Sequence, residues 1–229
     1  MWNRKLFSEK NERKGFLFWF LFDIFRKCVI LIMKETMVSL AKGSVTMPLL
    51  KDQFYTTEYI YSLPDGQRAE LIDGQIYDMT PPRRIHQKIL SFLHLEIGNY
   101  IRSKDGSCEV YPAPFAVFLD KDEYTYVEPD ISVICDKSKL DEYGCNGAPD
   151  WVIEIVSPSS KQMDYFTKLF KYREAGVREY WIVDPQRNQV MVYAFEVKDV
   201  SVYTFDEKVK AGIYEDLFID FSVISLEER

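Results

Sequence analysis

Two short apolar runs, residues 131–135 and 151–156, constrain the fold more than any other feature of this chain. Both are continuous rather than alternating in polarity, which is typical of strands covered on both faces of a sheet. Asp130 directly precedes the first run, and Glu154 lies inside the second. We therefore expect two central strands of one sheet, each with an acidic side chain.

The flanking patterns predict a hairpin and helices around this sheet. Asp73-Gly74 separates two strand-like runs, which is a strong hairpin signal. Apolar residues recur at helical spacing from Ile85 to Ile101, and a second helix is expected after Ser157-Pro158, ending at Ala175-Gly176. The order of these elements predicts an α/β (α+β) fold, a mixed central sheet with helices on its faces.

The second of these helices has two distinct faces in the sequence. Phe166 and Phe170 lie on one face, and we expect them to be buried. Asp164, Lys168 and Tyr172 follow one another at intervals of four residues and share a different face. The spacing therefore sets a lysine and an acid side by side on this helix.

Composition excludes several classes of protein. The chain has 229 residues, 47% of them apolar, which suits a single globular domain, and its net charge of -7 excludes a broad basic surface that coats nucleic acid. A nuclease stays possible, because bound divalent cations reverse the field of an acidic site. Four cysteines without C-x-x-C spacing and two histidines argue against zinc, and a reducing cytoplasm is the simplest location.

The N-terminal part differs from the rest, so we divide the chain into an apolar extension, residues 1–47, and one domain, residues 48–229. The extension carries Asp23, Arg26 and Lys27 between two apolar runs, which makes a poor membrane span. We therefore do not expect a membrane protein. A membrane anchor, an amphipathic interfacial helix and a leader added by an upstream start are the alternatives for this segment.

The two strand acids suggest metal chemistry. If the strands are neighbours, the carboxylates of Asp130 and Glu154 converge, and the backbone carbonyl of Ile155 supplies another oxygen of the kind that Mg²⁺ prefers. Lys168 would orient the attacking water or stabilise developing negative charge. Glu70, at the start of the first hairpin, could add a further carboxylate.

Several motifs between Phe54 and Phe195 keep a characteristic order. They are Glu70-Leu71-Ile72-Asp73-Gly74-Gln75-Ile76, His86, Pro129-Asp130, Glu154-Ile155-Val156-Ser157-Pro158, Asp164, Lys168, Tyr172 and Gly176-Val177-x-Glu179-Tyr180-Trp181-Ile182-Val183-Asp184. Together they resemble the Uma-type restriction endonuclease family, which belongs to the PD-(D/E)XK nuclease superfamily. Each motif alone is weak, but the combination is specific.

The resemblance implies a restriction-endonuclease-like sheet and a Mg²⁺-dependent endonuclease that hydrolyses DNA, with Mn²⁺ as a substitute ion. By position, the catalytic residues would be Glu70, Asp130, Glu154 and Lys168, with Asp130 and Glu154 holding the metal. One departure matters, because the superfamily carries lysine two residues after the second acid, where this chain has Val156. Lys168 on the following helix is then the matching amine. His86, Asp164 and Tyr172 would support the site.

Simpler interpretations of Lys168 and of the acids around it remain open. Glu154 could be a buried glutamate paired with Lys168 in a salt bridge without metal. Asp164, Lys168 and Tyr172 could instead form a solvated helix face with charge pairing at i,i+4.

The other candidates also have structural alternatives. Asp130 could be an acid that simply begins a strand beside a loop, and Glu70 could be a surface charge on an edge strand. His86 could be a hydrogen-bonded structural residue rather than a base.

Two rival functions follow. One is an inactive member of the nuclease fold that works as a binding or assembly module, and the other is a protein held at a membrane by residues 16–33. A homodimer would place two sites on a duplex, but the sequence contains no direct signal for it.

Overall fold

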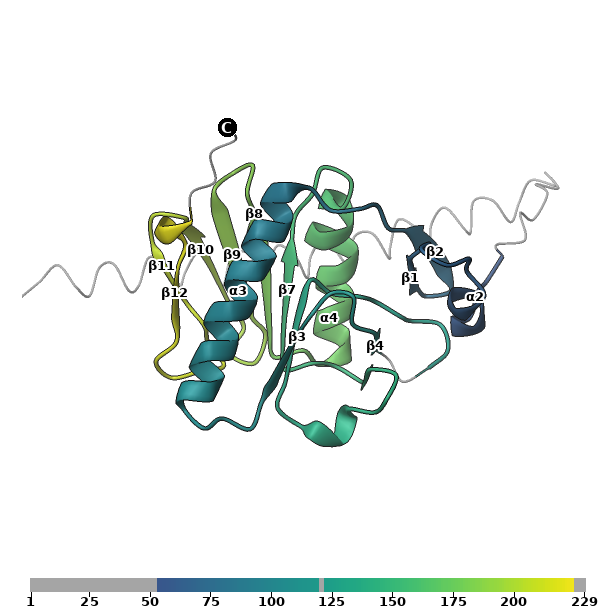
Figure 1. Cartoon of the computed structure of the whole chain (residues 1–229), viewed down its shortest axis with the longest axis horizontal. Helices are drawn as coiled ribbons and strands as arrows, with labels where there is room; N and C mark the ends of the chain where they lie inside the picture. The colour runs from purple at the N-terminus through teal and green to yellow at the C-terminus, as the bar shows by residue number, and fades with distance from the viewer. Residues whose placement is uncertain (1–52, 120–121, 225–229) are drawn as a thin grey trace, which may run out of the picture. The chain divides into compact units, whose positions relative to one another are not determined.

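A six-stranded mixed sheet (Figure 1) contains both apolar runs as neighbouring strands. The computed structural model describes residues 53–119 and 122–224, so the predicted extension, residues 1–47, lies outside the described part. The strands of the sheet are β3 (Glu109–Pro112), β5 (Ile131–Ile134), β7 (Trp151–Ile155), β8 (Glu179–Asp184), β9 (Gln189–Ala194) and β10 (Asp199–Thr204). Their order is β10-β9-β8-β7-β5-β3, in which β7 and β8 are parallel and the other neighbours antiparallel.

Helices cover both faces of this sheet. The long helix α3 (Arg84–Ser103) crosses one face (Figure 1). It packs against alternate residues of β7, including Ile153 and Ile155. A π-helical segment, η2 (Met163–Lys168), continues into α4 (Leu169–Ala175), and Tyr172 of α4 packs in the cluster on the other face. Because strand side chains alternate in direction, Glu154 points away from α3. The expected α/β fold is confirmed.

The predicted hairpin forms as expected. Strands β1 (Ala69–Ile72) and β2 (Gln75–Asp78) pair antiparallel around Asp73 and Gly74, whose φ angles are 51° and 75°. Two successive positive φ angles are the geometry of a type I′ turn, which favours Asp-Gly. A bridge between Leu71 and Tyr126 ties the hairpin to the loop that precedes β5. Its Glu70 is thereby held near the sheet.

Several short elements complete the described part, and the sequence patterns did not predict most of them. They are α2 (Thr57–Tyr61), β4 (Val117–Phe118), η1 (Lys137–Lys139), β6 (Cys145–Asn146), β11 (Lys208–Lys210), β12 (Phe218–Asp220) and η3 (Phe221–Val223). No helix among residues 53–119 and 122–224 combines the length and apolar character needed to cross a membrane.

The expected faces of the second helix are reversed. Phe166 is 62% exposed and Phe170 is 37% exposed, so the prediction that they are buried is wrong. Asp164, Lys168 and Tyr172 are buried instead. Lys168 and Tyr172 both contact the carboxylate of Glu154, which offsets the cost of burying their polar groups.

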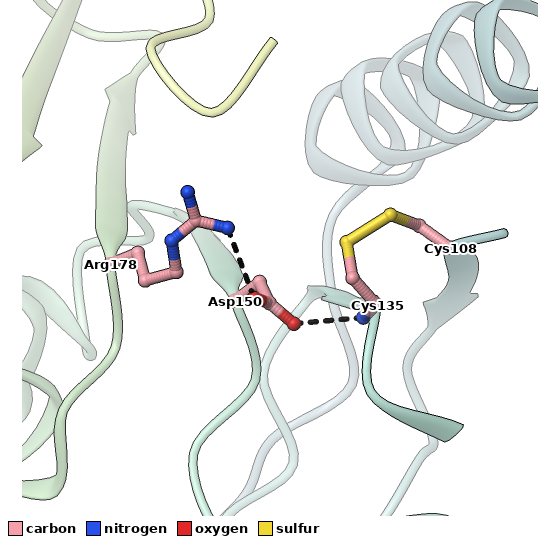
Figure 2. Close-up of a disulfide and its surroundings, with 4 residues drawn as sticks. All are labelled: Cys108, Cys135, Asp150 and Arg178. Atoms are coloured by element: carbon pink, nitrogen blue, oxygen red, sulfur yellow. Dashed lines mark hydrogen bonds and ion pairs between the residues drawn. A yellow bond between two sulfur atoms is a disulfide. The ribbon is translucent and has the colours of Figure 1, made fainter. Parts of the chain in front are cut away.

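A disulfide joins Cys108 to Cys135, one position beyond the register pair Glu109–Ile134 of β3 and β5 (Figure 2). The amide of Cys135 donates to Asp150, and Asp150 also accepts a hydrogen bond from Arg178 at 3.2 Å. The cysteine spacing did not predict this bond. Disulfides are rare in reducing compartments, so the pair gives the predicted cytoplasmic location no support.

Candidate active site

A pocket of about 440 Å³ lies where the hairpin, the first turn of α3, the ends of β5 and β7, and η2 meet. Among its lining residues are Glu70, His86, Asp130, Glu154, Ile155, Asp164 and Lys168. All the predicted site residues therefore line one pocket, except Tyr172, which is fully buried behind it.

Lys168 lies between two of the acidic side chains of the pocket. Its Nζ lies 2.8 Å from a carboxylate oxygen of Glu70 and 2.9 Å from Oε1 of Glu154. All three side chains are buried. The alternatives of a surface charge at Glu70 and a solvated face at Lys168 are therefore wrong. The salt-bridge alternative for Glu154 and Lys168 matches the observed contact.

Burial and mutual charge set the pKa values in this cluster. Burial raises the pKa of the Glu154 carboxyl well above 4.5, although the Lys168 ammonium acts in the opposite direction. Burial alone would lower the pKa of Lys168, but Glu154, Glu70 and Asp164 together raise it well above 10.5. The lysine therefore keeps its positive charge.

Tyr172 fixes the orientation of Glu154. Its hydroxyl donates to Oε1 of Glu154 at 2.6 Å, the same oxygen that Lys168 contacts. Burial raises the pKa of Tyr172 well above 10, so the phenol stays a donor. The other oxygen, Oε2, accepts a long 3.4 Å hydrogen bond from the amide of Asp130.

Strand register brings Asp130 beside Glu154. Ile131 of β5 pairs with Ile153 of β7, and in an antiparallel ladder the preceding residue of one strand then faces the following residue of the other. Asp130 Oδ2 accepts a 2.7 Å hydrogen bond from the amide of Ile155. It also lies 3.0 Å from Nε2 of His86, which reaches it from α3.

Asp164 is the least satisfied polar group of the pocket. It is 1% exposed, and neither of its carboxylate oxygens has a hydrogen-bond partner among the described residues. Lys168 Nζ lies 4.0 Å from Oδ1. Burial raises the pKa of Asp164 to about 6.

Sequence reasoning assigned no role to Arg68 and Glu128, which also line the pocket. Glu128 is buried, accepts hydrogen bonds from Arg68 and Tyr126, and donates its amide to Glu70 at 2.9 Å. The position of Glu128, two residues before Asp130, was the only feature of the sequence that could have marked it as a pocket residue. The partners lie 60 residues apart in sequence, so the pairing could not be read from spacing.

The donor chemistry of the pocket suits Mg²⁺. Within residues 53–119 and 122–224, no three His, Cys, Asp or Glu side chains are grouped closely enough to hold a metal ion. Mg²⁺ commonly binds through one or two carboxylates and keeps several waters. The adjacent carboxylates of Asp130 and Glu154, with the carbonyl of Ile155, supply oxygens of this kind.

Comparison with known proteins agrees with this fold. The chain resembles the crystal structure of a protein from Anabaena variabilis ATCC 29413 described as a putative nuclease, with a TM-score of 0.61 and 23% identity. The match covers 73% of this chain and 95% of the other. No curated protein matches the sequence. A family model described as "Putative restriction endonuclease" (Uma2) matches residues 52–220, most of the chain, and the protein therefore belongs to that family.

Proposed function

We propose that the protein is a metal-dependent endonuclease that hydrolyses phosphodiester bonds in DNA, with Mg²⁺ as its ion and Mn²⁺ as a substitute. The observation that carries the proposal is the meeting of Asp130, Glu154 and Lys168 at one pocket, from two strands and a helix. Family membership supports the same reaction class.

The two adjacent acids would hold the ion. Asp130 and Glu154 face the pocket side by side, and the carbonyl of Ile155 completes the protein's oxygen donors. When bound, the ion would lower the pKa of a water and offset negative charge on the phosphate. His86 and the amide of Ile155 would fix the carboxylate of Asp130, because both contact its Oδ2.

Lys168 would act as the site's permanent cation. Its ammonium group lies between Glu70 and Glu154, and its raised pKa keeps it charged at neutral pH. In this position it would orient the attacking water and stabilise developing negative charge. Its place on η2 offers a physical account of why Val156 can stand where the superfamily carries lysine.

Nicking of supercoiled plasmid in Mg²⁺ tests the proposal. Glu154→Gln and Asp130→Asn keep the side-chain size and should each abolish nicking. Asp150→Asn is a matched control, since Asp150 also accepts a strand amide but belongs to the Arg178 ion pair rather than to the lining of the pocket. Undiminished nicking by both site variants would refute the proposal.

A second candidate is an inactive member of the fold that acts as a binding or assembly module. The direct ion pair between Lys168 and Glu154 favours it, because the lysine occupies an oxygen that a metal ligand would need. Titration calorimetry separates the two candidates. Heat from Mg²⁺ or Mn²⁺ that disappears in Glu154→Gln supports the nuclease, whereas no binding at millimolar ion supports the module.

A further inference from the structure

The pocket of the proposed nuclease has an excess of negative charge and would repel a polyanion. Its lining includes six acids and three lysines or arginines: Glu70, Asp78, Glu128, Asp130, Glu154 and Asp164 against Arg68, Arg83 and Lys168. Lys168 is buried and already shared between two carboxylates. A phosphate that enters the pocket therefore needs a cation nearer to solvent.

Arg68 has the position and the spare donors for this role. Its side chain is 37% exposed, and it lines the pocket immediately before β1, two residues from Glu70. Its Nε donates to Glu128 Oε2 at 2.8 Å, and its Nη2 donates to the same oxygen. A guanidinium has five N–H donors, so among the described residues three are left for a ligand.

Glu128 holds this guanidinium in one orientation. The carboxylate is buried, and its other oxygen accepts a 2.7 Å hydrogen bond from Tyr126. The amide of Glu128 donates to Glu70, which itself contacts Lys168. Arg68 is therefore fixed relative to the charged cluster before any ligand arrives, and a fixed planar fork suits the oxygens of a phosphate.

We infer that Arg68, oriented by Glu128, binds a backbone phosphate of the nucleic-acid substrate at the mouth of the pocket. The inference rests on the proposed function for the class of substrate. It assigns Arg68 to substrate binding and Glu128 to positioning, and neither residue belongs to the acids and lysine that would carry out hydrolysis.

The test measures binding of fluorescent duplex DNA by anisotropy, with Ca²⁺ in place of Mg²⁺, across about 50 to 200 mM salt. The main variant is Arg68→Gln combined with Glu128→Gln. It replaces the ion pair by an amide pair and leaves the net charge unchanged, so it avoids a buried unpaired carboxylate. Arg68→Lys keeps the charge and removes the fork.

The double variant should bind about tenfold more weakly, because one charge-assisted hydrogen bond is lost. The slope of log K against log salt should become shallower by about 0.9, the value for one lost phosphate contact. Arg68→Lys should keep most of the wild-type salt slope but only part of the wild-type affinity for DNA. Thermal unfolding checks that each variant is folded.

Arg178→Ala is the matched control. Arg178 is 39% exposed and pairs with Asp150 (Figure 2) and with Glu196. Neither partner lines this pocket. The variant should bind DNA with the wild-type slope.

A wild-type slope in the folded double variant would overturn the inference, and so would a wild-type protein that fails to bind DNA. Plasmid nicking in Mg²⁺ is measured separately. A protein that binds DNA through Arg68 but never cuts it would refute the proposed function and support the inference.

Discussion

Lys168 and Glu154 form a direct ion pair, with Nζ 2.9 Å from Oε1, although one belongs to a π-helical turn and the other to a buried strand. Glu70 contacts the same ammonium from the hairpin. One lysine therefore balances carboxylates from two separate sheets, and its removal should affect stability as well as chemistry.

Lys168→Met should abolish nicking and destabilise the protein by about 3–5 kcal/mol at neutral pH, because two buried carboxylates lose their cation. The loss should be smaller near pH 5, because burial raises the pKa of the Glu154 carboxyl and favours its uptake of a proton. Urea unfolding at both pH values measures it. Lys161→Met, at a partly exposed lysine 3.8 Å from Asp184, should cost below about 1 kcal/mol. Equal costs for both lysines would contradict this account.

Asp164→Asn should change the pH dependence of stability. Burial raises the pKa of Asp164 from 3.8 to about 6, so the folded state favours the protonated form. Ionisation then costs stability as pH rises from about 4 to about 6, and the cost is constant above that range. In EDTA, the variant should be more stable than wild type above pH 6, by up to about 3 kcal/mol, and similar to it near pH 4. A difference that does not vary with pH would argue against a raised pKa.

Tyr172→Phe should lower activity and destabilise the protein by about 1–3 kcal/mol, since a buried carboxyl oxygen of Glu154 loses its hydroxyl donor. Tyr180→Phe is the matched control. Tyr180 is equally buried, but its hydroxyl donates to the backbone carbonyl of Asp164. It should cost about 1 kcal/mol and leave nicking rates near wild type. Loss of nicking in both variants would show general disruption rather than orientation of Glu154.

Replacing Cys108 and Cys135 together by serine should lower the free energy of unfolding by about 3.5 kcal/mol, the loop-closure value for a separation of 27 residues. Thermal unfolding with and without dithiothreitol measures this effect. The reductant should lower the Tm of the wild type and leave the double variant unchanged. Cys145→Ser changes a buried cysteine that forms no disulfide among the described residues, and this variant should still respond to the reductant. No response in the wild type would mean that the bond is absent in solution.

Much of the fold could be predicted because it depends on local patterns. The turn at Asp73-Gly74, the helical spacing of α3 and the left-handed Gly176 that ends α4 were all visible in the sequence. The sequence did not show which face of η2 is buried. Apolar periodicity marks Phe166 as a core residue, but the tertiary structure buries the polar face where Lys168 meets its carboxylates.

How much of the site could be predicted depended on whether the order of the strands in the sheet could be predicted. Asp130 and Glu154 meet because β5 and β7 are neighbours, a condition that the two apolar runs left open. Arg68 and Glu128 pair across 60 residues, and the two cysteines across 27, and no periodicity encodes such contacts. They depend on how the hairpin and β3 lie against the rest of the fold.

The placement of Glu70 has a consequence for how the protein opens. The hairpin β1–β2 is a sheet of its own, tied to the following loop by the bridge from Leu71 to Tyr126. A peripheral hairpin would ordinarily fray first. Here, lifting it would separate Glu70 from Lys168, so local opening carries an electrostatic penalty. The hairpin amides should consequently exchange their hydrogens almost as slowly as those of the central strands, and the pocket should stay assembled for as long as the domain is folded.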